Sequence, residues 1–121
     1  MPTTREVLDH HLKCLGEGNL EGILADYAPD AVLFTPNGPL NGIGAITAAF
    51  AATLQQFSQP GTTFDMKQVS VDGEHAYIVW SAETADQIYE IATDTFVIRE
   101  GKIVAQSFAA KITAKAEAQA S

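Results

Sequence analysis

The spacing of apolar residues changes once along this chain and divides it into a helical part and a strand part. Up to about residue 60, apolar residues recur every three or four positions, which is typical of amphipathic helices. From residue 62 onward the spacing is close to two, which is typical of half-buried strands. The pattern therefore predicts helices followed by an antiparallel sheet.

Three helices are expected in the first part. Thr3 and Glu6 form a capping box that begins the first, and Asn19 caps a short second one that Pro29 ends. A strand over residues 31–35 and a turn over residues 36–39 precede the third helix. The predicted apolar faces are Val7, Leu8, His11, Leu12 and Leu15, then Leu20, Ile23, Leu24 and Tyr27, then Ile43, Ile46, Phe50, Leu54 and Phe57.

Four strands are expected in the second part, over residues 62–71, 74–84, 87–99 and 102–113. Asp72-Gly73 and Glu100-Gly101 supply two hairpin turns. Helices packed on one face of a curved antiparallel sheet make a single α+β domain over residues 1–113, with 114–121 as a flexible tail. A curved sheet covered by helices leaves a concave interior, where small ligands bind.

Composition narrows the choice of partners. The chain has 121 residues, of which 46% are hydrophobic and 18% charged, as in a globular domain. Seven basic against fifteen acidic residues give a net charge of −8, so neither nucleic acid nor a membrane surface is an expected partner. Cys14 is the only cysteine and the first residues lack the apolar run of a signal peptide, which predicts a cytoplasmic location.

Two groups of residues carry a resemblance to a known family. The first is residues 18–24 (Gly-Asn-Leu-Glu-Gly-Ile-Leu) with 27–31 (Tyr-Ala-Pro-Asp-Ala), and the second is residues 94–96 (Asp-Thr-Phe) ahead of 100–103 (Glu-Gly-Lys-Ile). With the order of elements, they resemble the nuclear-transport-factor-2-like superfamily, in particular its ketosteroid-isomerase-like and polyketide-cyclase-like (SnoaL-like) branch. The resemblance implies a cone of curved sheet and helices, the cystatin-like fold. It implies no single activity, because the superfamily includes isomerases, cyclases, dehydratases, epoxide hydrolases and non-catalytic modules.

The resemblance assigns roles at three positions. Isomerase members hold a general-base Asp where this chain has Thr35, and an oxyanion-stabilising Tyr where it has His11. The third group, an acid on a later strand, matches Asp94. In isomerases this acid is protonated and donates a hydrogen bond, whereas in cyclase-like members it is implied to be the base. Because two of three positions differ, authentic steroid isomerase activity is not expected.

Asp94 and His11 are therefore the candidate catalytic residues. An Asp in an apolar cavity has its pKa raised by desolvation, which suits a base or a neutral donor. His11 would donate to an oxyanion or exchange a proton with Asp94. Alternation along the strand places Glu90 inward with Asp94. The resemblance completes the expected substrate-binding wall with Tyr27, Thr35, Phe50, Val79, Ser81, Glu83, Gln106 and Phe108.

Other interpretations of these residues stay open. Asp94 is alternatively a solvent-facing or backbone-bonded carboxylate, and His11 a core histidine with its hydrogen bonds satisfied. His10 and Cys14 are spaced four apart on a helix, yet two ligands are too few for a metal site. Cys14 has no clear base partner for a nucleophilic role. No cofactor is expected.

Two functions from different classes follow. The first is a cofactor-free isomerase, cyclase or lyase in which Asp94 moves a proton next to a carbonyl of a small apolar or cyclic molecule. Epoxide hydrolysis is less favoured, since no Arg lies between two expected inward carboxylates. The alternative is a non-catalytic ligand-binding or association module, which the absent base at Thr35 favours. In either case we expect a homodimer through the outer sheet face, with Trp80 buried in it.

Overall fold

The computed structural model describes residues 2–115. These residues form three helices and six strands in the order α1 (Thr4–Glu17), α2 (Leu20–Ala25), β1 (Tyr27–Thr35), β2 (Gly38–Asn41), α3 (Gly42–Phe57), β3 (Thr63–Asp72), β4 (His75–Glu83), β5 (Gln87–Arg99) and β6 (Lys102–Ala114). The expected tail from residue 116 to 121 lies outside the described residues.

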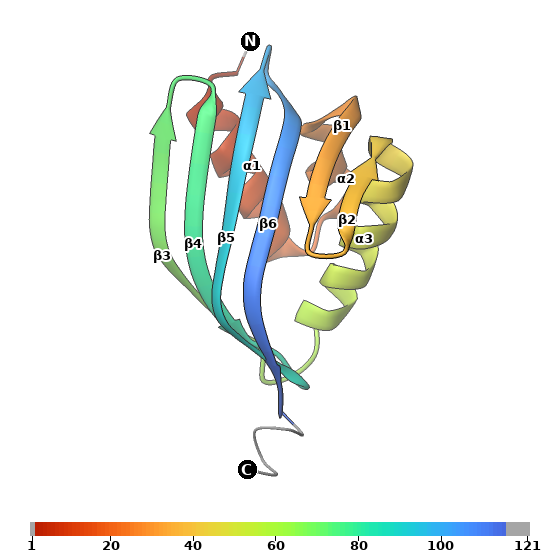
Figure 1. Cartoon of the computed structure of the whole chain (residues 1–121), viewed down its shortest axis with the longest axis vertical. Coiled ribbons are helices and arrows are strands. Elements are labelled where there is room, and N and C mark those ends of the chain that lie inside the picture. The colour runs from red at the N-terminus through yellow and green to blue at the C-terminus, as the bar shows by residue number, and fades with distance from the viewer. Residues whose placement is uncertain (1, 116–121) are drawn as a thin grey trace.

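The strands form one curved, unclosed sheet in the order β2-β1-β6-β5-β4-β3. β1 runs parallel to β6 and the other neighbours are antiparallel. All three helices lie on the same side of the sheet (Figure 1). The predicted α+β architecture is confirmed.

Local sequence signals set the first two helices as expected. The Glu6 N–H donates to Thr3 Oγ1 at 3.1 Å and the Thr3 N–H to Glu6 Oε1 at 3.0 Å, which completes the capping box. Gly18 ends α1 with a φ of 68°, which glycine adopts without steric cost. Asn19 then caps α2 by accepting the Gly22 N–H at 3.0 Å.

Two predicted boundaries around β1 are wrong. Tyr27 begins β1 rather than ending the second helix, because α2 stops at Ala25. The expected turn over residues 36–39 is shorter, and Gly38–Asn41 forms β2, which pairs with β1 from Thr35↔Gly38 to Val32↔Asn41. Pro39 is tolerated in this strand because β2 lies at the edge of the sheet.

A β-bulge in β5 reverses the expected orientation of Glu90. Trp80 pairs with Ala92 while Ala82 pairs with Tyr89, so two residues of β5 lie opposite one residue of β4. Tyr89 is buried inward as a result and Glu90 is exposed on the outer face. Strict alternation from Asp94 fails at this point because the bulge adds one residue.

The orientation predicted for β4 is also wrong. Its buried residues are Ala76, Ile78, Trp80 and Ala82. Val79, Ser81 and Glu83 therefore face outward, and Trp80 lies inside the molecule with 9% of its surface exposed. The sequence is ambiguous here because apolar residues occupy both phases of the strand.

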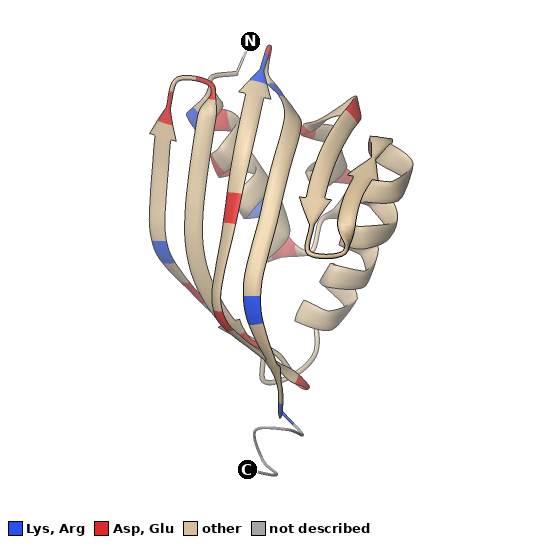
Figure 2. Cartoon of the chain, in the orientation of Figure 1, with Lys and Arg blue, Asp and Glu red and all other residues tan. Residues whose placement is uncertain are grey.

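The hydrophobic core fills the space between the inner sheet face and the helices. Its fully buried members come from every layer: Leu8, Ile23, Ile46, Phe96 and Ile103. Charged residues gather at strand ends and turns, and few lie in the middle of the strands (Figure 2). No helix within residues 2–115 is long and apolar enough to cross a membrane.

Candidate functional site

A row of polar side chains crosses the core between the sheet and α1, joined by hydrogen bonds from Trp80 to His11 and by a 3.6 Å approach of His11 to Asp26. We call it the polar chain, and its members are Trp80, Asp94, Gln106, Tyr27, His11 and Asp26. They come from β4, β5, β6, β1, α1 and the end of α2, so the fold assembles the chain from almost every element.

Asp94 is the buried carboxylate of the polar chain, with 7% of its surface exposed. Trp80 Nε1 donates to Asp94 Oδ2 at 2.9 Å, and Gln106 Nε2 donates to Asp94 Oδ1 at 2.9 Å. Burial raises the pKa of Asp94 above its ordinary value, although the two donors and the nearby His11 act in the opposite direction. The predicted inward orientation of Asp94 is confirmed.

Tyr27 links the two halves of the polar chain. Its hydroxyl donates to Gln106 Oε1 and lies 3.4 Å from His11 Nε2. Burial, reinforced by the charges of Asp94 and Asp26, raises the pKa of Tyr27 far above its ordinary value. Tyr27 therefore stays a phenol and always holds one proton to donate.

His11 is fully buried and packs edge-to-face against three aromatic rings. Its ring centroid lies 5.4 Å from that of Tyr27, 5.9 Å from Phe50 and 5.7 Å from Phe96. Nδ1 of His11 has no hydrogen-bond partner and lies 3.6 Å from Asp26 Oδ2. His11 meets Asp94 only through Tyr27 and Gln106, so direct contact between the two predicted catalytic residues is absent from this structure.

Asp26 connects the polar chain to the surface. Nδ1 of His10 lies 2.8 Å and 2.9 Å from its two carboxylate oxygens, and the His10 side chain is half-exposed. Cys14 is buried against His10, with Sγ 3.5 Å from Nε2, and burial raises the pKa of its thiol. A raised pKa disfavours the reactive thiolate. Residues 2–115 hold no cluster of three His, Cys, Asp or Glu side chains suited to a metal ion.

Thr35 and Phe108 also face the interior and are half-buried. The Thr35 hydroxyl donates to the Gly38 carbonyl at 2.9 Å and accepts the Asn37 N–H at 3.1 Å, so the β1–β2 turn uses it. Phe108 pairs across the sheet with Asp94, in the orientation that the sequence predicted.

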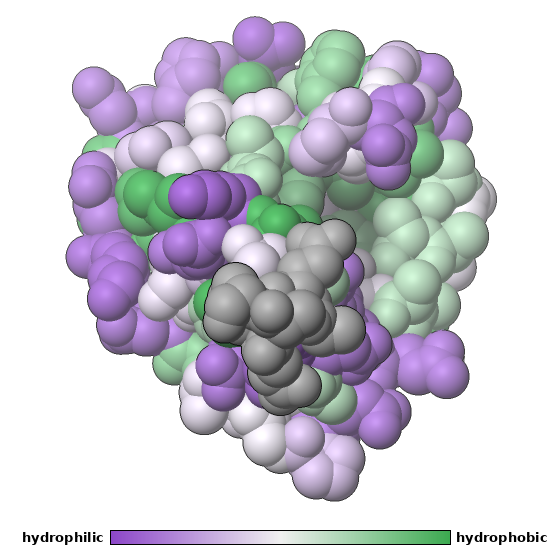
Figure 3. Space-filling model, turned by 60° about the horizontal axis from the view of Figure 1, so that its bottom comes forward, coloured by the Kyte–Doolittle hydropathy of each residue, from purple (hydrophilic) through white to green (hydrophobic). Residues whose placement is uncertain are grey.

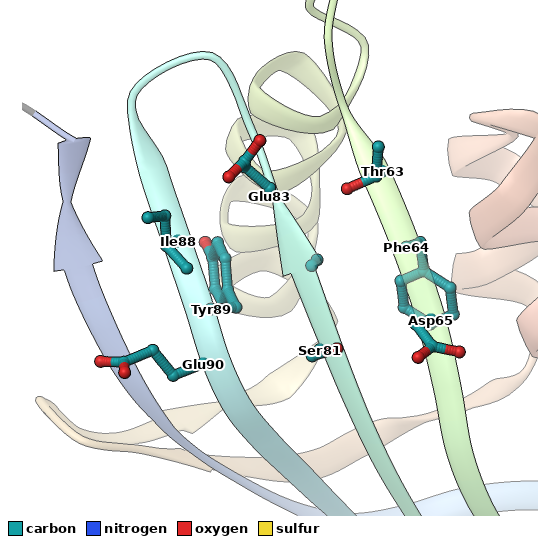
Figure 4. Close-up of a pocket in the computed structure, with 9 residues that line it drawn as sticks. Thr63, Phe64, Asp65, Ser81, Glu83, Ile88, Tyr89 and Glu90 are labelled. Carbon is teal, nitrogen blue, oxygen red and sulfur yellow. The ribbon is translucent and has the colours of Figure 1, made fainter.

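Four predicted wall residues lie on the outer face instead: Val79, Ser81, Glu83 and Glu90. Three of them, Ser81, Glu83 and Glu90, line a shallow hollow of about 330 Å³ with Thr63, Phe64, Asp65, Ala82, Ile88 and Tyr89 (Figure 4). Asp94 and His11 are not among its lining residues. This hollow therefore brings together different carboxylates from those of the predicted site.

Each carboxylate that lines this hollow, which we call the outer hollow, pairs with a lysine. The distance from Nζ of the lysine to the carboxylate oxygen is 2.6 Å for Lys67 and Asp65, 3.5 Å for Lys115 and Glu83, and 3.6 Å for Lys111 and Glu90. Thr113 donates to Glu90 at 2.8 Å, and this bond, followed by the charge of Lys111, lowers the pKa of Glu90. The hollow is therefore electrostatically balanced rather than poised to move a proton.

Four aromatic residues surround Trp80, and the sequence assigned only one of them, Phe108, to the site. Ring centroids lie 5.4 Å away for Phe64, 5.5 Å for Tyr89, 6.1 Å for Phe57 and 6.2 Å for Phe108. The missed signal is the alternation of Ala76, Ile78, Trp80 and Ala82, whose small and apolar members suit an inner face. Assigning these four residues to the inner face would have placed Trp80 on the same side of the sheet as Asp94.

Five inward-facing residues are only partly buried. They are Thr35, Leu54, Phe57, Phe108 and Ala110. The end of the molecule where β6 finishes shows an apolar hollow between the sheet and the side of α3 (Figure 3).

The three helices on one face of a curved, unclosed six-stranded sheet define a nuclear-transport-factor-2-like fold. The SnoaL-like domain model matches residues 8–106, and the chain therefore belongs to the SnoaL-like domain family. The chain matches none of the curated proteins.

Solved structures of this class are similar to the chain over nearly its full length. The epoxide hydrolase/cyclase-like enzyme SalBIII of salinomycin pyran ring formation has a TM-score of 0.77 at 17% identity, covering 92% of this chain and 95% of that one. A protein from Sinorhizobium meliloti assigned as a polyketide cyclase has a TM-score of 0.72 at 18% identity, covering 90% and 95%. One from Kribbella flavida assigned as a ketosteroid isomerase has 0.73 at 14% identity, covering 89% and 77%. At these identities the likeness shows the fold alone.

Proposed function

We propose that this protein binds a small apolar or cyclic molecule and catalyses proton transfer next to its carbonyl group, as a cofactor-free isomerase, cyclase or lyase. Asp94 is the acid–base group. The observation that carries the proposal is the environment of Asp94, a buried carboxyl with a raised pKa beside the aromatic rings of Trp80 and Phe108. A raised pKa brings a carboxyl closer to the pH at which a general acid–base group works best.

The neighbours of Asp94 support this role. Trp80 and Gln106 donate one hydrogen bond to each oxygen and fix the plane of the carboxylate. Neither donor carries a formal charge, so the carboxylate is oriented without a Lys or Arg partner that would hold its pKa low. Structural relatives assigned as a cyclase and an isomerase agree with such chemistry, although only by fold.

His11 acts through Tyr27 in this proposal. Because His11 is fully buried, it is a positioning group for the polar chain rather than a direct donor to an enolate. The Thr35 hydroxyl is held by the β1–β2 turn and does not replace the base of the steroid isomerases. The substrate is therefore expected to differ from that of authentic steroid isomerases.

Deuterium exchange at carbon tests the proposed reaction without knowledge of the natural substrate. A panel of cyclic ketones is incubated with the protein in D2O, and loss of the protons next to the carbonyl is followed by NMR. We expect catalysed exchange with at least one ketone, abolished by Asp94→Asn and retained by Glu90→Gln. Exchange that survives in a folded Asp94→Asn variant would contradict the proposal.

One observation favours the alternative, a non-catalytic ligand-binding or association module. Both oxygens of Asp94 already accept hydrogen bonds from the protein, and 7% of the residue is exposed. Native mass spectrometry of the purified protein separates the two functions when it is combined with the exchange assay. A bound small molecule without exchange on any ketone would favour the ligand-binding module.

We also propose a homodimer through the outer sheet face, although without the predicted role of Trp80, which lies inside. Large apolar residues exposed on this face support the proposal: Phe34, Tyr77 and Ile91. Burial of such residues on association is favourable. Light scattering should give the mass of two chains, and Tyr77→Lys should shift the measured mass toward that of one chain.

A cytoplasmic location stays a prediction from the single cysteine.

A further inference from the structure

The hydrogen bonds of the polar chain can run in either of two directions, and the side-chain amide of Gln106 sets which one. We propose that Gln106 and Tyr27 couple Asp94 to His11, so that His11 carries its proton on Nε2 when Asp94 is ionised and on Nδ1 when Asp94 is protonated. The consequence for turnover rests on the proposed function, whereas the coupling itself is a property of the folded protein.

The direction seen in the structure belongs to ionised Asp94. A carboxylate only accepts, so Gln106 presents its NH2 group to Asp94 and its oxygen to Tyr27. Tyr27 then donates its single proton to Gln106. The Tyr27 oxygen remains free to accept, and the partner 3.4 Å away is His11 Nε2. His11 must therefore present an N–H at Nε2.

Protonation of Asp94 reverses each of these bonds. A carboxylic acid donates, and a half-turn of the Gln106 amide places its oxygen where its nitrogen stood. The NH2 group of Gln106 then donates to the Tyr27 oxygen, and the Tyr27 proton turns to His11. His11 must now accept at Nε2 and carry its proton on Nδ1. The raised pKa of Tyr27 keeps one proton on its hydroxyl, so Tyr27 donates to Gln106 or to His11 but never to both.

The unpartnered Nδ1 of His11 is the second observation that fits this coupling. It lies 3.6 Å from Asp26 Oδ2, within reach of an ion pair but outside hydrogen-bond distance. A proton on Nδ1 faces a carboxylate, while a lone pair there faces the same charge unfavourably. The tautomer with the proton on Nε2 leaves Nδ1 without a hydrogen-bond partner, as in the structure. The tautomer with the proton on Nδ1 points it toward the Asp26 carboxylate, and both tautomers carry one ring proton.

The change from ionised to protonated Asp94 adds one proton, which comes from the bound molecule or solvent. His11 keeps its one ring proton, which moves from Nε2 to Nδ1, where it faces Asp26 and, beyond Asp26, half-exposed His10. The charged and titratable groups facing the chain are Asp26 and His10, with Cys14 against His10. Phe50 and Phe96, which also pack on His11, are uncharged. The state of His11 therefore reports on Asp94 without a competing cation in contact with either.

Nitrogen-15 NMR of His11 tests the coupling with no substrate. In the wild type, at a pH where the Asp94 carboxyl carbon reports a carboxylate, Nε2 should resonate as a protonated ring nitrogen. Asp94→Asn offers an N–H to Gln106 as the protonated acid would, so Nε2 should move to the position of an unprotonated nitrogen. His10, whose Nδ1 bonds to Asp26, should not change and serves as the internal control.

A second variant isolates the route. Tyr27→Phe removes the hydroxyl that joins Gln106 to His11, so adding Asp94→Asn to it should leave Nε2 of His11 unmoved. If Asp94→Asn does not fold, a wild-type titration replaces it: Nε2 should gain a proton as the pH rises through the Asp94 transition, the reverse of an ordinary histidine. The inference is overturned if Nε2 keeps one state while Asp94 titrates or is replaced.

The outcomes separate this inference from the proposed function. If His11 changes with Asp94 but no ketone exchanges, the catalytic role of Asp94 is contradicted and the coupling stands. If exchange depends on Asp94 but His11 keeps one state, the coupling is contradicted and the catalytic role stands. If the coupling and the catalytic role of Asp94 are both correct, a folded Tyr27→Phe variant should show a shifted pH profile of ketone exchange. If Tyr27 is only structural, the variant should lower the exchange rate without moving the profile.

Discussion

The two faces of β5 place carboxylates only four residues apart in opposite electrostatic surroundings. Asp94 lies on the inner face, where burial raises its pKa. Glu90 lies on the outer face, where a hydrogen bond from Thr113 and the charge of Lys111 lower its pKa. The pKa values of the two carboxyls are therefore shifted in opposite directions along one strand. Which face a carboxylate occupies decides its chemistry here, more than which acid it is.

The partners of the two carboxylates explain the difference. Outer carboxylates meet lysines and water, which stabilise the ionised form. Asp94 meets an indole, an amide and, through Tyr27, a buried histidine. The inner face orients a carboxyl without neutralising it, whereas the outer face neutralises carboxyls without burying them.

Removal of Trp80 should have the largest effect on the inner face. Trp80→Ala leaves a cavity beside Phe57 and Phe108 and takes one donor from Asp94, so we expect a loss of about 3–5 kcal/mol in the free energy of unfolding. Urea titration measures this loss. Trp80→Phe keeps most of the packing and isolates the lost donor, and a change below about 1 kcal/mol in Trp80→Ala would contradict the inner placement of the indole.

Gln106 offers the next test, since it holds the middle of the polar chain. Gln106→Leu keeps the apolar volume but leaves an Asp94 oxygen and the Tyr27 hydroxyl without partners, which should cost on the order of 1–3 kcal/mol. Ser81→Ala on the outer face is the matched control and should stay within about 0.5 kcal/mol. Equal losses in both variants would remove the distinction between the faces.

Much of this architecture could be predicted from the sequence. The capping box, the change of period and the Asp72-Gly73 and Glu100-Gly101 turns fix the main helices and strands. Asp94, Gln106 and Phe108 face inward, as the family resemblance implied. Local patterns therefore predicted the main elements, and the resemblance predicted the orientation of these three side chains.

The remainder depends on contacts that a linear pattern does not contain. The bulge at Glu90 arises from pairing with β4, and β4 itself has apolar residues in both phases. Trp80 was consequently assigned to the wrong face, which also hid its hydrogen bond to Asp94. The link from Asp26 to His11 requires the end of α2 to meet α1, another tertiary contact.

The pH dependence of stability sharpens the comparison further. Since the folded pKa of Asp94 is raised, its ionisation is a penalty that is absent below the unfolded pKa of about 3.9 and complete above the folded pKa. The stability of Asp94→Asn relative to the wild type should therefore rise with pH across that window. Thermal unfolding at a series of pH values measures it, and a difference that falls with pH would indicate a structural carboxylate with a lowered pKa.

Glu90 should give the smallest effect. Glu90→Gln removes a solvent-exposed partner of Lys111 and Thr113, so neither ketone exchange nor the unfolding temperature should change measurably near neutral pH. Below that range, the wild type should lose the small benefit of ionised Glu90 as its carboxylate is protonated. A loss of exchange in Glu90→Gln would move the site to the outer hollow.

Carbon-13 NMR of the side-chain carboxyl groups tests the central claim most directly, because it observes Asp94 and Glu90 in the same sample. Each carbon is followed from acid to neutral pH in the wild type, with Asp94→Asn and Glu90→Gln for assignment. We predict that Asp94 titrates above its ordinary value and that Glu90 titrates below its own. Titration of Asp94 at or below its ordinary value would contradict the account of Asp94 as a desolvated acid–base group.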